Sequence, residues 1–273
     1  LPIAARMTAD STELDPAARR LADVRENIVR AALIASRAPE DITLIAISKT
    51  HGADEITPLV HAGQRHFGEN RVQEAEAKWP ALRERTPDIM LHLVGQLQSN
   101  KAAHAVALFD VIHALDRPSL VKALALAMDA AGKRLPCFVQ VNIGAESQKG
   151  GCPIADVPAL LAQARGADIP VEGLMCLPPL DVEAAPYFAL LAKMARDNGL
   201  TGLSMGMSGD YETAVMLGAS HVRVGTALFG ALVFALIPDT DVGHLAEHAR
   251  NGSRDALLPA FHTAFLVAAV VAA

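Results

Sequence analysis

Residues 41–56 read DITLIAISKTHGADEI, and this stretch decides the fold. The run ITLIAIS is almost continuously apolar, which is typical of a strand buried on both faces of a parallel sheet. It stops at Lys49, a residue type that normally stays in water. Residues 53–62 then show helical spacing. A buried strand, a polar turn and a helix together form one β/α unit.

The same unit recurs along the chain. Residues 16–37 precede it as a predicted helix, with Pro16 suited to the first turn. Further strands are predicted at 65–68, 90–95, 111–115, 137–142, 171–177, 202–207 and 221–224, and further helices at 72–85, 119–131, 154–165, 184–198 and 210–217. Roughly eight units predict a (β/α)8 barrel, and the even spacing favours it over a doubly wound open sheet.

The composition excludes several function classes. The chain has 273 residues, of which 51% are hydrophobic, and a net charge of −6. No basic cluster is present, so we expect no nucleic-acid partner. The terminal run FLVAAVVAA is far shorter than the ~20 apolar residues of a membrane span. An odd count of three cysteines, with no C-x-x-C pair, indicates a reducing, cytoplasmic setting.

The histidines do not predict a metal site. His51, His61 and His66 lack the H-E-x-x-H spacing of a zinc site. His92 and His113 lie in predicted strands, where a histidine is most often a hydrogen-bonded core residue.

Three segments are predicted. Residues 1–14 form an N-terminal extension that lacks the features of a signal peptide, and Met7 is a candidate natural start. Residues 15–230 form the barrel. Residues 231–273 show no clear β/α pattern and form an atypical C-terminal tail.

Lys49 is the first candidate functional residue, because barrel enzymes carry their chemistry where the strands end. A lysine at the end of a buried strand loses hydration, and its amine then becomes nucleophilic, as a Schiff-base lysine requires. The alternative is that its flexible side chain simply reaches water at the barrel mouth.

A second candidate site lies in residues 202–230. Ser208 is predicted to end the seventh strand and open a helix, and Gly225 and Thr226 follow the eighth strand. Free amides at helix starts bind phosphate, and loops after strands seven and eight are the usual phosphate site of this barrel. Gly225 would let the backbone approach a ligand closely. Two ordinary glycine turns are the alternative.

A nucleophilic lysine and a phosphate site on one face predict a phosphorylated aldehyde or ketone held as an imine. Pyridoxal phosphate fits this description, and so does a sugar phosphate in a class I aldolase. Arg223, on the last strand, is placed to reach a pyridine nitrogen, or else to pair with a neighbouring carboxylate.

Several motifs in order resemble the pyridoxal phosphate homeostasis proteins (the YggS/PROSC family). They are IAISKT (45–50), HFGENRVQEAEAK (66–78), LHLVGQLQSNK (91–101), VNIGAESQKGG (141–151), VEGLMCLPP (171–179) and LSMGMSGDYETAVMLGASHVRVGTALFG (203–230). The resemblance covers roughly residues 15–230, and it implies a barrel like the N-terminal domain of alanine racemase. The family usually ends soon after Phe229 and Gly230, so the tail is a departure.

The resemblance also implies residue roles. Lys49 would hold pyridoxal phosphate as an imine, and Asn70 would line the cofactor near it. Ser208, Gly225 and Thr226 would bind the phosphate. In addition, Arg223 would face the pyridine nitrogen.

These roles favour binding over catalysis. A permanently charged arginine disfavours protonation of the ring nitrogen, which makes the ring a weaker electron sink. The only tyrosines, Tyr187 and Tyr211, do not lie in an added β domain like the one that supplies the second base of alanine racemase. We therefore expect a monomeric, non-catalytic protein that buffers pyridoxal phosphate and delivers it to apo enzymes. A racemase-like pyridoxal phosphate enzyme is the alternative.

Overall fold

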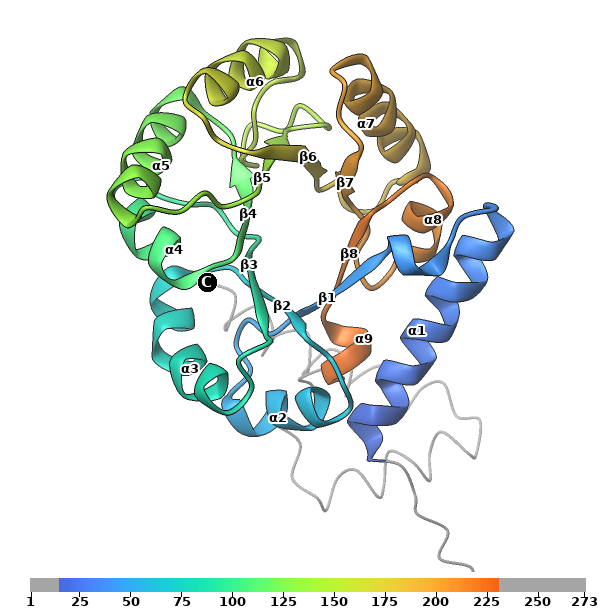
Figure 1. Ribbon diagram of the computed structural model, residues 1–273. Coiled ribbons are helices and arrows are strands. Elements are labelled where there is room, and N and C mark those ends of the chain that lie inside the picture. The colour runs from blue at the N-terminus through green and yellow to red at the C-terminus, as the bar shows by residue number, and fades with distance from the viewer. Residues whose placement is uncertain (1–14, 231–273) are drawn as a thin grey trace, which may run out of the picture. The chain divides into compact units, whose positions relative to one another are not determined.

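The computed structural model describes residues 15–230, which form a closed barrel of eight parallel strands in chain order (Figure 1). The strands are β1 (Thr43–Ile47), β2 (His66–Glu69), β3 (Met90–Leu93), β4 (Val111–Leu115), β5 (Cys137–Val141), β6 (Val171–Cys176), β7 (Gly202–Ser204) and β8 (His221–Val224). β8 pairs with β1, with Thr43 opposite His221 and Ala46 opposite Val224. This closure confirms the predicted (β/α)8 barrel and excludes the open sheet.

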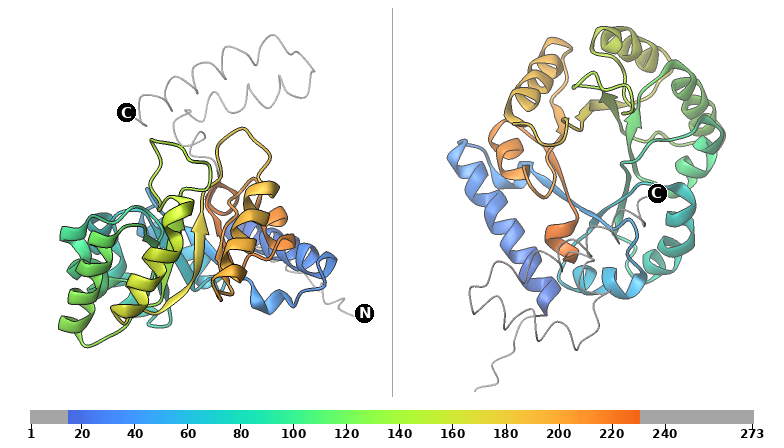
Figure 2. Two further views of the ribbon diagram at one scale, coloured as in Figure 1. Left: turned by 90° about the horizontal axis from the view of Figure 1, so that it is seen from above. Right: turned by 180° about the vertical axis from the view of Figure 1, so that it is seen from behind.

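The helices surround the strands (Figures 1 and 2). They are α1 (Pro16–Ile34), α2 (Ala53–His61), α3 (Val72–Arg85), α4 (Ala102–Leu108), α5 (Pro118–Ala131), α6 (Val157–Gly166), α7 (Ala185–Asp197), α8 (Tyr211–Met216) and α9 (Thr226–Phe229). Because α9 has a single turn, it cannot cover the last strand alone. Instead α1 packs against α8, α9 and α2 and closes the ring.

Several local features differ from the sequence prediction. β7 ends at Ser204, three residues early, because Gly206 takes a φ of +91° that a strand does not allow. The sequence prediction misses α4 and α9, and it ends the first helix three residues late and the third strand two residues late. The helix expected at 154–165 is divided into a 3-10 turn (Ile154–Asp156) and α6.

The apolar core lies between the strands and the helices. Its largest fully buried side chains include Trp79, Phe67, Phe109 and Phe188, and burying each such side chain stabilises the fold by about 1.5–3 kcal/mol. The barrel interior is different, because polar side chains fill much of it. They include His92, His113, Ser204 and Arg223, all buried, beside Phe138. Polar residues inside a barrel must be hydrogen-bonded to one another.

The predicted extension (1–14) and tail (231–273) lie outside the described residues, so these boundaries stay predictions. Within residues 15–230, no helix is long and apolar enough to cross a membrane. The same residues contain no cluster of three or more side chains that could bind a metal ion.

Candidate functional site

The turn after β1 carries Lys49 and is strained. Ser48 continues the strand direction, since its amide donates to the Gly68 carbonyl oxygen at 3.0 Å. Thr50 has a φ of +67°. A β-branched residue in the left-handed region is an outlier, and such outliers persist only where neighbouring contacts hold them.

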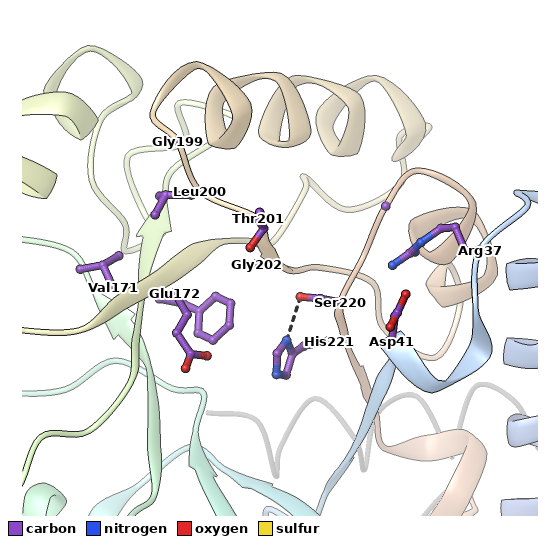
Figure 3. Close-up of a pocket in the computed structure, with 12 residues that line it drawn as sticks. Arg37, Asp41, Val171, Glu172, Gly199, Leu200, Thr201, Gly202, Ser220 and His221 are labelled. Carbon is purple, nitrogen blue, oxygen red and sulfur yellow. Dashed lines mark hydrogen bonds between the residues drawn. The ribbon is translucent and has the colours of Figure 1, made fainter.

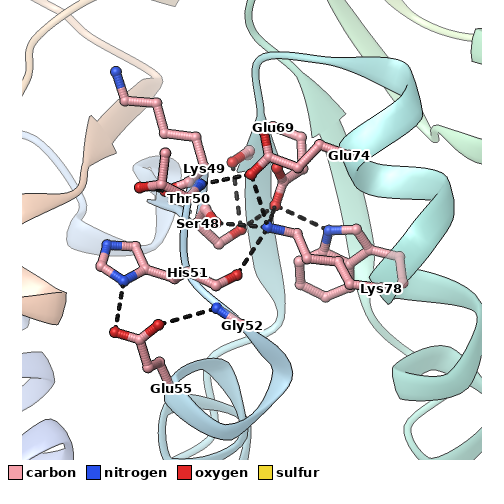
Figure 4. Close-up of polar contacts among 11 residues, drawn as sticks. Ser48, Lys49, Thr50, His51, Gly52, Glu55, Glu69, Glu74 and Lys78 are labelled. Atoms are coloured by element: carbon pink, nitrogen blue, oxygen red, sulfur yellow. Dashed lines mark hydrogen bonds and ion pairs between the residues drawn. The ribbon is translucent and has the colours of Figure 1, made fainter. Parts of the chain in front are cut away.

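Lys78 of α3 supplies those contacts. Its ammonium donates to the carbonyl oxygens of Ser48 at 2.7 Å and His51 at 3.1 Å, and lies 2.8 Å from Glu69 Oε1 (Figure 4). Glu69 is completely buried, and the same oxygen accepts hydrogen bonds from the Ser48 hydroxyl and the Trp79 indole. The buried ion pair therefore holds both sides of the turn.

Glu74 completes the support, one helical turn before Lys78. Its Oε1 accepts a hydrogen bond from the Thr50 amide at 2.6 Å and lies 3.6 Å from the Lys78 ammonium. Glu74 thereby satisfies the amide of the strained residue. We call Glu69, Glu74 and Lys78 the turn clamp.

Lys49 itself is exposed, and Figure 4 shows its side chain pointing away from the turn clamp. Among residues 15–230 its amine has no hydrogen-bond or ion-pair partner. The expectation that this lysine is stripped of water is therefore wrong for the protein alone, because the side chain extends to solvent beyond the strand end. The buried lysine is Lys78, whose ammonium is already fully engaged.

Asn70 follows β2, the neighbour of β1, and is half-buried. Its backbone packs closely against Gly95 after β3: a Cβ added to Gly95 would lie 2.3 Å from the Asn70 carbonyl oxygen. Gly95 therefore lets the two loops meet and keeps Asn70 in place.

Ser208 and Gly225 are brought together as the sequence predicts, since the Gly225 amide donates to Ser208 Oγ at 3.2 Å. This leaves the Ser208 hydroxyl proton for another acceptor. A Cβ added to Gly225 would meet nothing closer than Ile47 at 3.5 Å, an ordinary contact. The fold itself therefore leaves room for a side chain at this position.

Two details of the predicted phosphate site change. Ser208 lies in the turn before α8 and does not end the strand. Thr226 is exposed and begins α9, which has only four residues. Helices this short add little dipole field. A phosphate here would depend on individual amide and hydroxyl donors.

Arg223 is buried inside the barrel. It donates to Ser204 Oγ at 2.7 Å and to the Cys176 carbonyl oxygen at 2.8 Å. Burial lowers the pKa of its guanidinium to about 10. The alternative of a salt bridge fails, because Arg223 forms no ion pair within the described part of the chain. A guanidinium has five N–H donors, so donors remain for a ligand.

The candidate residues come from one continuous part of the barrel. Ser208 follows β7, Arg223 and Gly225 come from β8 and its loop, Lys49 follows β1, and Asn70 follows β2. These four strands are consecutive neighbours. The strand-end face thus gathers an unpaired amine, hydroxyl and amide donors and a buried guanidinium.

Sequence reasoning missed the roles of the turn clamp and of Ser204. The spacing of Glu74 and Lys78 suits a helix ion pair, but it does not reveal the carbonyls that Lys78 binds. The positive φ of Thr50 leaves no mark in the sequence.

Lys149 and the three cysteines do not offer a second free nucleophile among the described residues. Lys149 pairs with Glu146 at 2.7 Å and donates to the Pro178 carbonyl oxygen at 2.9 Å, so its amine is occupied. All three cysteines are buried and unpaired, and burial raises the pKa of the Cys137 and Cys176 thiols to about 12. Buried thiols of this kind act as small apolar side chains.

Comparison with known proteins identifies the family. Residues 20–233 match the family model for the alanine racemase N-terminal domain. The chain is 38% identical over 226 residues to the pyridoxal phosphate homeostasis protein of Escherichia coli K12, covering 78% of this chain and 96% of that protein. It is 37% identical over 222 residues to the protein of the same name from Pseudomonas aeruginosa, covering 78% and 95%.

Solved structures agree. A structure of PipY from Synechococcus elongatus with PLP bound is 40% identical, covers 78% of this chain and all of that chain, and has a TM-score of 0.68. Alanine racemase from Clostridium difficile, at 14% identity and a TM-score of 0.57 over 76% of this chain and 56% of that chain, shares the fold alone. Together these matches show that the chain belongs to the family of pyridoxal phosphate homeostasis proteins, which are built on the alanine racemase N-terminal fold.

Proposed function

We propose that this protein binds pyridoxal phosphate at the strand-end face of the barrel and serves its homeostasis by holding and handing over the cofactor. The observation that carries the proposal is the unpaired Lys49 amine on a clamped turn, in the same part of the barrel as Ser208 and Gly225. The relatives named for pyridoxal phosphate homeostasis, and PipY with PLP bound, support it.

The residues present fit this cofactor. The amine of Lys49 would hold the aldehyde as an imine. The Ser208 hydroxyl, with Gly225 and Thr226, would receive the phosphate. Arg223 has donors left over inside a buried site, where an unsatisfied donor is costly, and a pyridine nitrogen would accept one. Asn70 would line the space between them.

The same residues favour binding over turnover. When bound, pyridoxal phosphate supplies an electron sink, which is strongest when its ring nitrogen is protonated. The Arg223 guanidinium only donates hydrogen bonds, so it cannot accept one from a protonated ring nitrogen. Neither tyrosine is placed as a second base: Tyr211 is buried in α8, where its hydroxyl binds Asn27, and Tyr187 lies in α7. For these reasons we rank a racemase-like activity second, behind binding and delivery.

The first experiment is a visible absorption spectrum of the purified protein before and after borohydride, followed by peptide mass mapping. We expect a yellow band that borohydride bleaches, and a phosphopyridoxyl mass on the Lys49 peptide. Lys49→Ala should lose both, whereas the matched control Lys149→Ala should keep them. A protein that stays colourless with added pyridoxal phosphate would overturn the proposal and favour a sugar phosphate.

Turnover and delivery need separate assays. We expect no efficient racemisation of L-amino acids by chiral analysis; robust activity that Lys49→Ala abolishes would contradict the non-catalytic part. Transfer of labelled cofactor to an apo pyridoxal phosphate enzyme tests delivery. We further propose that the protein is a monomer, which light scattering tests, and that it works in the cytoplasm, since its three free thiols suit a reducing compartment.

A further inference from the structure

A continuous chain of hydrogen bonds crosses the barrel interior and ends at Arg223. His66 Nδ1 lies 3.0 Å from His92 Nε2, and His92 Nδ1 lies 2.9 Å from His113 Nε2. His113 Nδ1 lies 2.9 Å from Ser204 Oγ, which accepts the hydrogen bond from Arg223. We call these five residues the histidine chain. It joins strands β2, β3, β4, β7 and β8.

The far end of the histidine chain lies toward the strand starts. His66 is half-buried and lines a hollow beside the first residues of β1 and β2. A larger cavity of about 620 Å³ lies at the strand starts of β6, β7 and β8, and His221 and Ser220 line it (Figure 3). His221 bonds to Ser220 and packs edge-on against His113. The histidine chain thus runs between the two ends of the barrel.

Arg223 gives the histidine chain a single direction. A guanidinium only donates, so Ser204 Oγ accepts from it. The Ser204 hydroxyl proton then has one acceptor in range among the described residues, His113 Nδ1. His113 therefore carries its proton on Nε2 and donates to His92 Nδ1. By the same reasoning His92 carries its proton on Nε2 and donates to His66 Nδ1.

The imidazoles must be neutral for this arrangement. A doubly protonated ring would point an N–H at a neighbour that already donates to it. Burial lowers the pKa of His92 and His113 well below the ordinary value of 6.5, and the nearby His221 and Arg223 lower that of His113 further. Burial also lowers the pKa of His66, against the opposing charge of Asp110. Arg223 is thus the one fixed charge of the histidine chain.

We propose that Ser204, His113 and His92 are positioning residues that fix the orientation of the Arg223 guanidinium toward the cofactor ring. This inference rests on the proposed function. Ser204 takes one N–H of Arg223 and the Cys176 carbonyl takes another, so the guanidinium plane is held at two points. His113 in turn holds the Ser204 hydroxyl so that its lone pair faces Arg223.

We infer that the polar groups of the histidine chain serve to orient the Arg223 guanidinium. Well-packed apolar residues usually stabilise a core at least as well as buried polar networks do. Without an acceptor at position 204, Arg223 would keep only one anchor and could rotate. A rotated guanidinium would no longer present a donor to the pyridine nitrogen, and the cofactor would lose one charge-assisted hydrogen bond.

The first test concerns the histidine chain alone and needs no cofactor. The full protein, labelled with ¹⁵N-histidine and stripped of cofactor, is studied by NMR between about pH 6 and 8. We expect His92 and His113 to stay neutral with the proton on Nε2 throughout. Protonation of either Nδ1 would overturn the inference, whether or not the protein binds pyridoxal phosphate.

The second test measures the pyridoxal phosphate dissociation constant. Ser204→Ala should weaken binding about tenfold, the size of one hydrogen bond to a charged group. It should also move the His113 Nδ1 resonance, which loses its donor. Ser204→Thr keeps a hydroxyl. It should restore the dissociation constant to within about twofold of wild type and return the His113 Nδ1 resonance to its wild-type position.

Ser220→Ala is the matched control, because Ser220 binds a barrel histidine outside the histidine chain. It should change the dissociation constant by less than about twofold. A folded Ser204→Ala protein that binds as tightly as wild type would refute the positioning role. If wild type itself fails to bind while the tautomers are as expected, the proposed function fails and the polarity of the histidine chain stands.

Discussion

The ammonium of Lys78 lies 2.8 Å from the fully buried carboxylate of Glu69, and it also donates to the carbonyl oxygens on either side of the Lys49 turn. One buried lysine thus positions the backbone of an exposed one. The Glu69 oxygen that Lys78 does not touch is buried without a hydrogen-bond partner among residues 15–230. The Lys78 charge, together with the hydrogen bonds from Ser48 and Trp79 to the other oxygen, compensates for burying this carboxylate.

Removing Lys78 should be strongly destabilising. Lys78→Ala leaves the Glu69 charge buried and unpaired, which costs about 3–5 kcal/mol of the free energy of unfolding. Urea unfolding measures the change. The control is Lys193→Ala, because Lys193 and Asp197 form an exposed i,i+4 pair, whose loss should cost no more than about 0.5 kcal/mol. Equal effects for the two variants would contradict the role of the turn clamp.

Relieving the strain at Thr50 should separate stability from binding. The left-handed conformation costs a non-glycine residue about 1–2 kcal/mol, while glycine adds about 0.5–1 kcal/mol of unfolded-state entropy. Thr50→Gly should therefore be as stable as wild type or up to about 1.5 kcal/mol more stable. Its Lys49 turn should be looser, so retention of pyridoxal phosphate should fall.

Thr50→Ala is the control for the hydroxyl, since alanine keeps the strained conformation. Thermal unfolding and a cofactor-retention assay on a desalting column compare the three proteins. A Thr50→Gly protein that loses more than about 1 kcal/mol would show that the turn is not strained.

Replacing Gly225 or Gly206 with alanine should affect the free energy of unfolding very differently. Gly225→Ala should leave the free energy of unfolding within about 0.5 kcal/mol of wild type, since its Cβ would meet only Ile47 at 3.5 Å. Gly206→Ala should cost about 1–3 kcal/mol, because φ is +91° and the new Cβ would lie 2.5 Å from Ala214 Cβ. Denaturant unfolding gives both values.

Gly225→Ala should change cofactor affinity although it leaves stability unchanged. A methyl group where the phosphate approaches should weaken pyridoxal phosphate binding by tenfold or more, about 1.4 kcal/mol. Fluorescence titration of the folded variant measures this. Unchanged affinity in Gly225→Ala would mean that the phosphate does not approach this backbone.

The buried histidines should make stability depend on pH. Folding lowers the pKa of His92 and His113 well below 6.5, and that of His221 to about 4, chiefly by burial. Between these values and ~6.5 the unfolded chain binds protons that the folded chain does not. The free energy of unfolding should therefore fall as the pH drops from ~7 towards ~4, by about 1.4 kcal/mol per pH unit for each histidine.

His113→Phe removes one titrating group, so the slope of the free energy of unfolding against pH should fall by about 1.4 kcal/mol per pH unit. Phenylalanine is chosen because it keeps the stacking surface against Phe138. Urea unfolding at a series of pH values gives the slope for both proteins. The same slope in both would show that His113 is not a neutral buried group.

The barrel and the position of its strand-end face could both be predicted from the sequence. Strand and helix alternation is a local pattern, readable from the period of apolar residues, and it placed Lys49, Asn70 and Gly225 at strand ends correctly. The contact between Ser208 and Gly225 also followed, because loops after neighbouring strands of a barrel must meet. Where local backbone geometry prevailed, as at Gly206 after β7, the predicted strand was too long.

Two features could be seen only in the folded barrel: which lysine is buried, and which groups hold Arg223. Lys49 follows a buried strand yet reaches solvent, whereas Lys78 lies on a helix and its side chain is only 11% exposed. His113 and Ser204 are 91 residues apart, and Arg223 and Cys176 are 47 apart. Such contacts depend on the register between the eight strands, which brings distant positions together inside the barrel, and no local pattern in the sequence encodes that register.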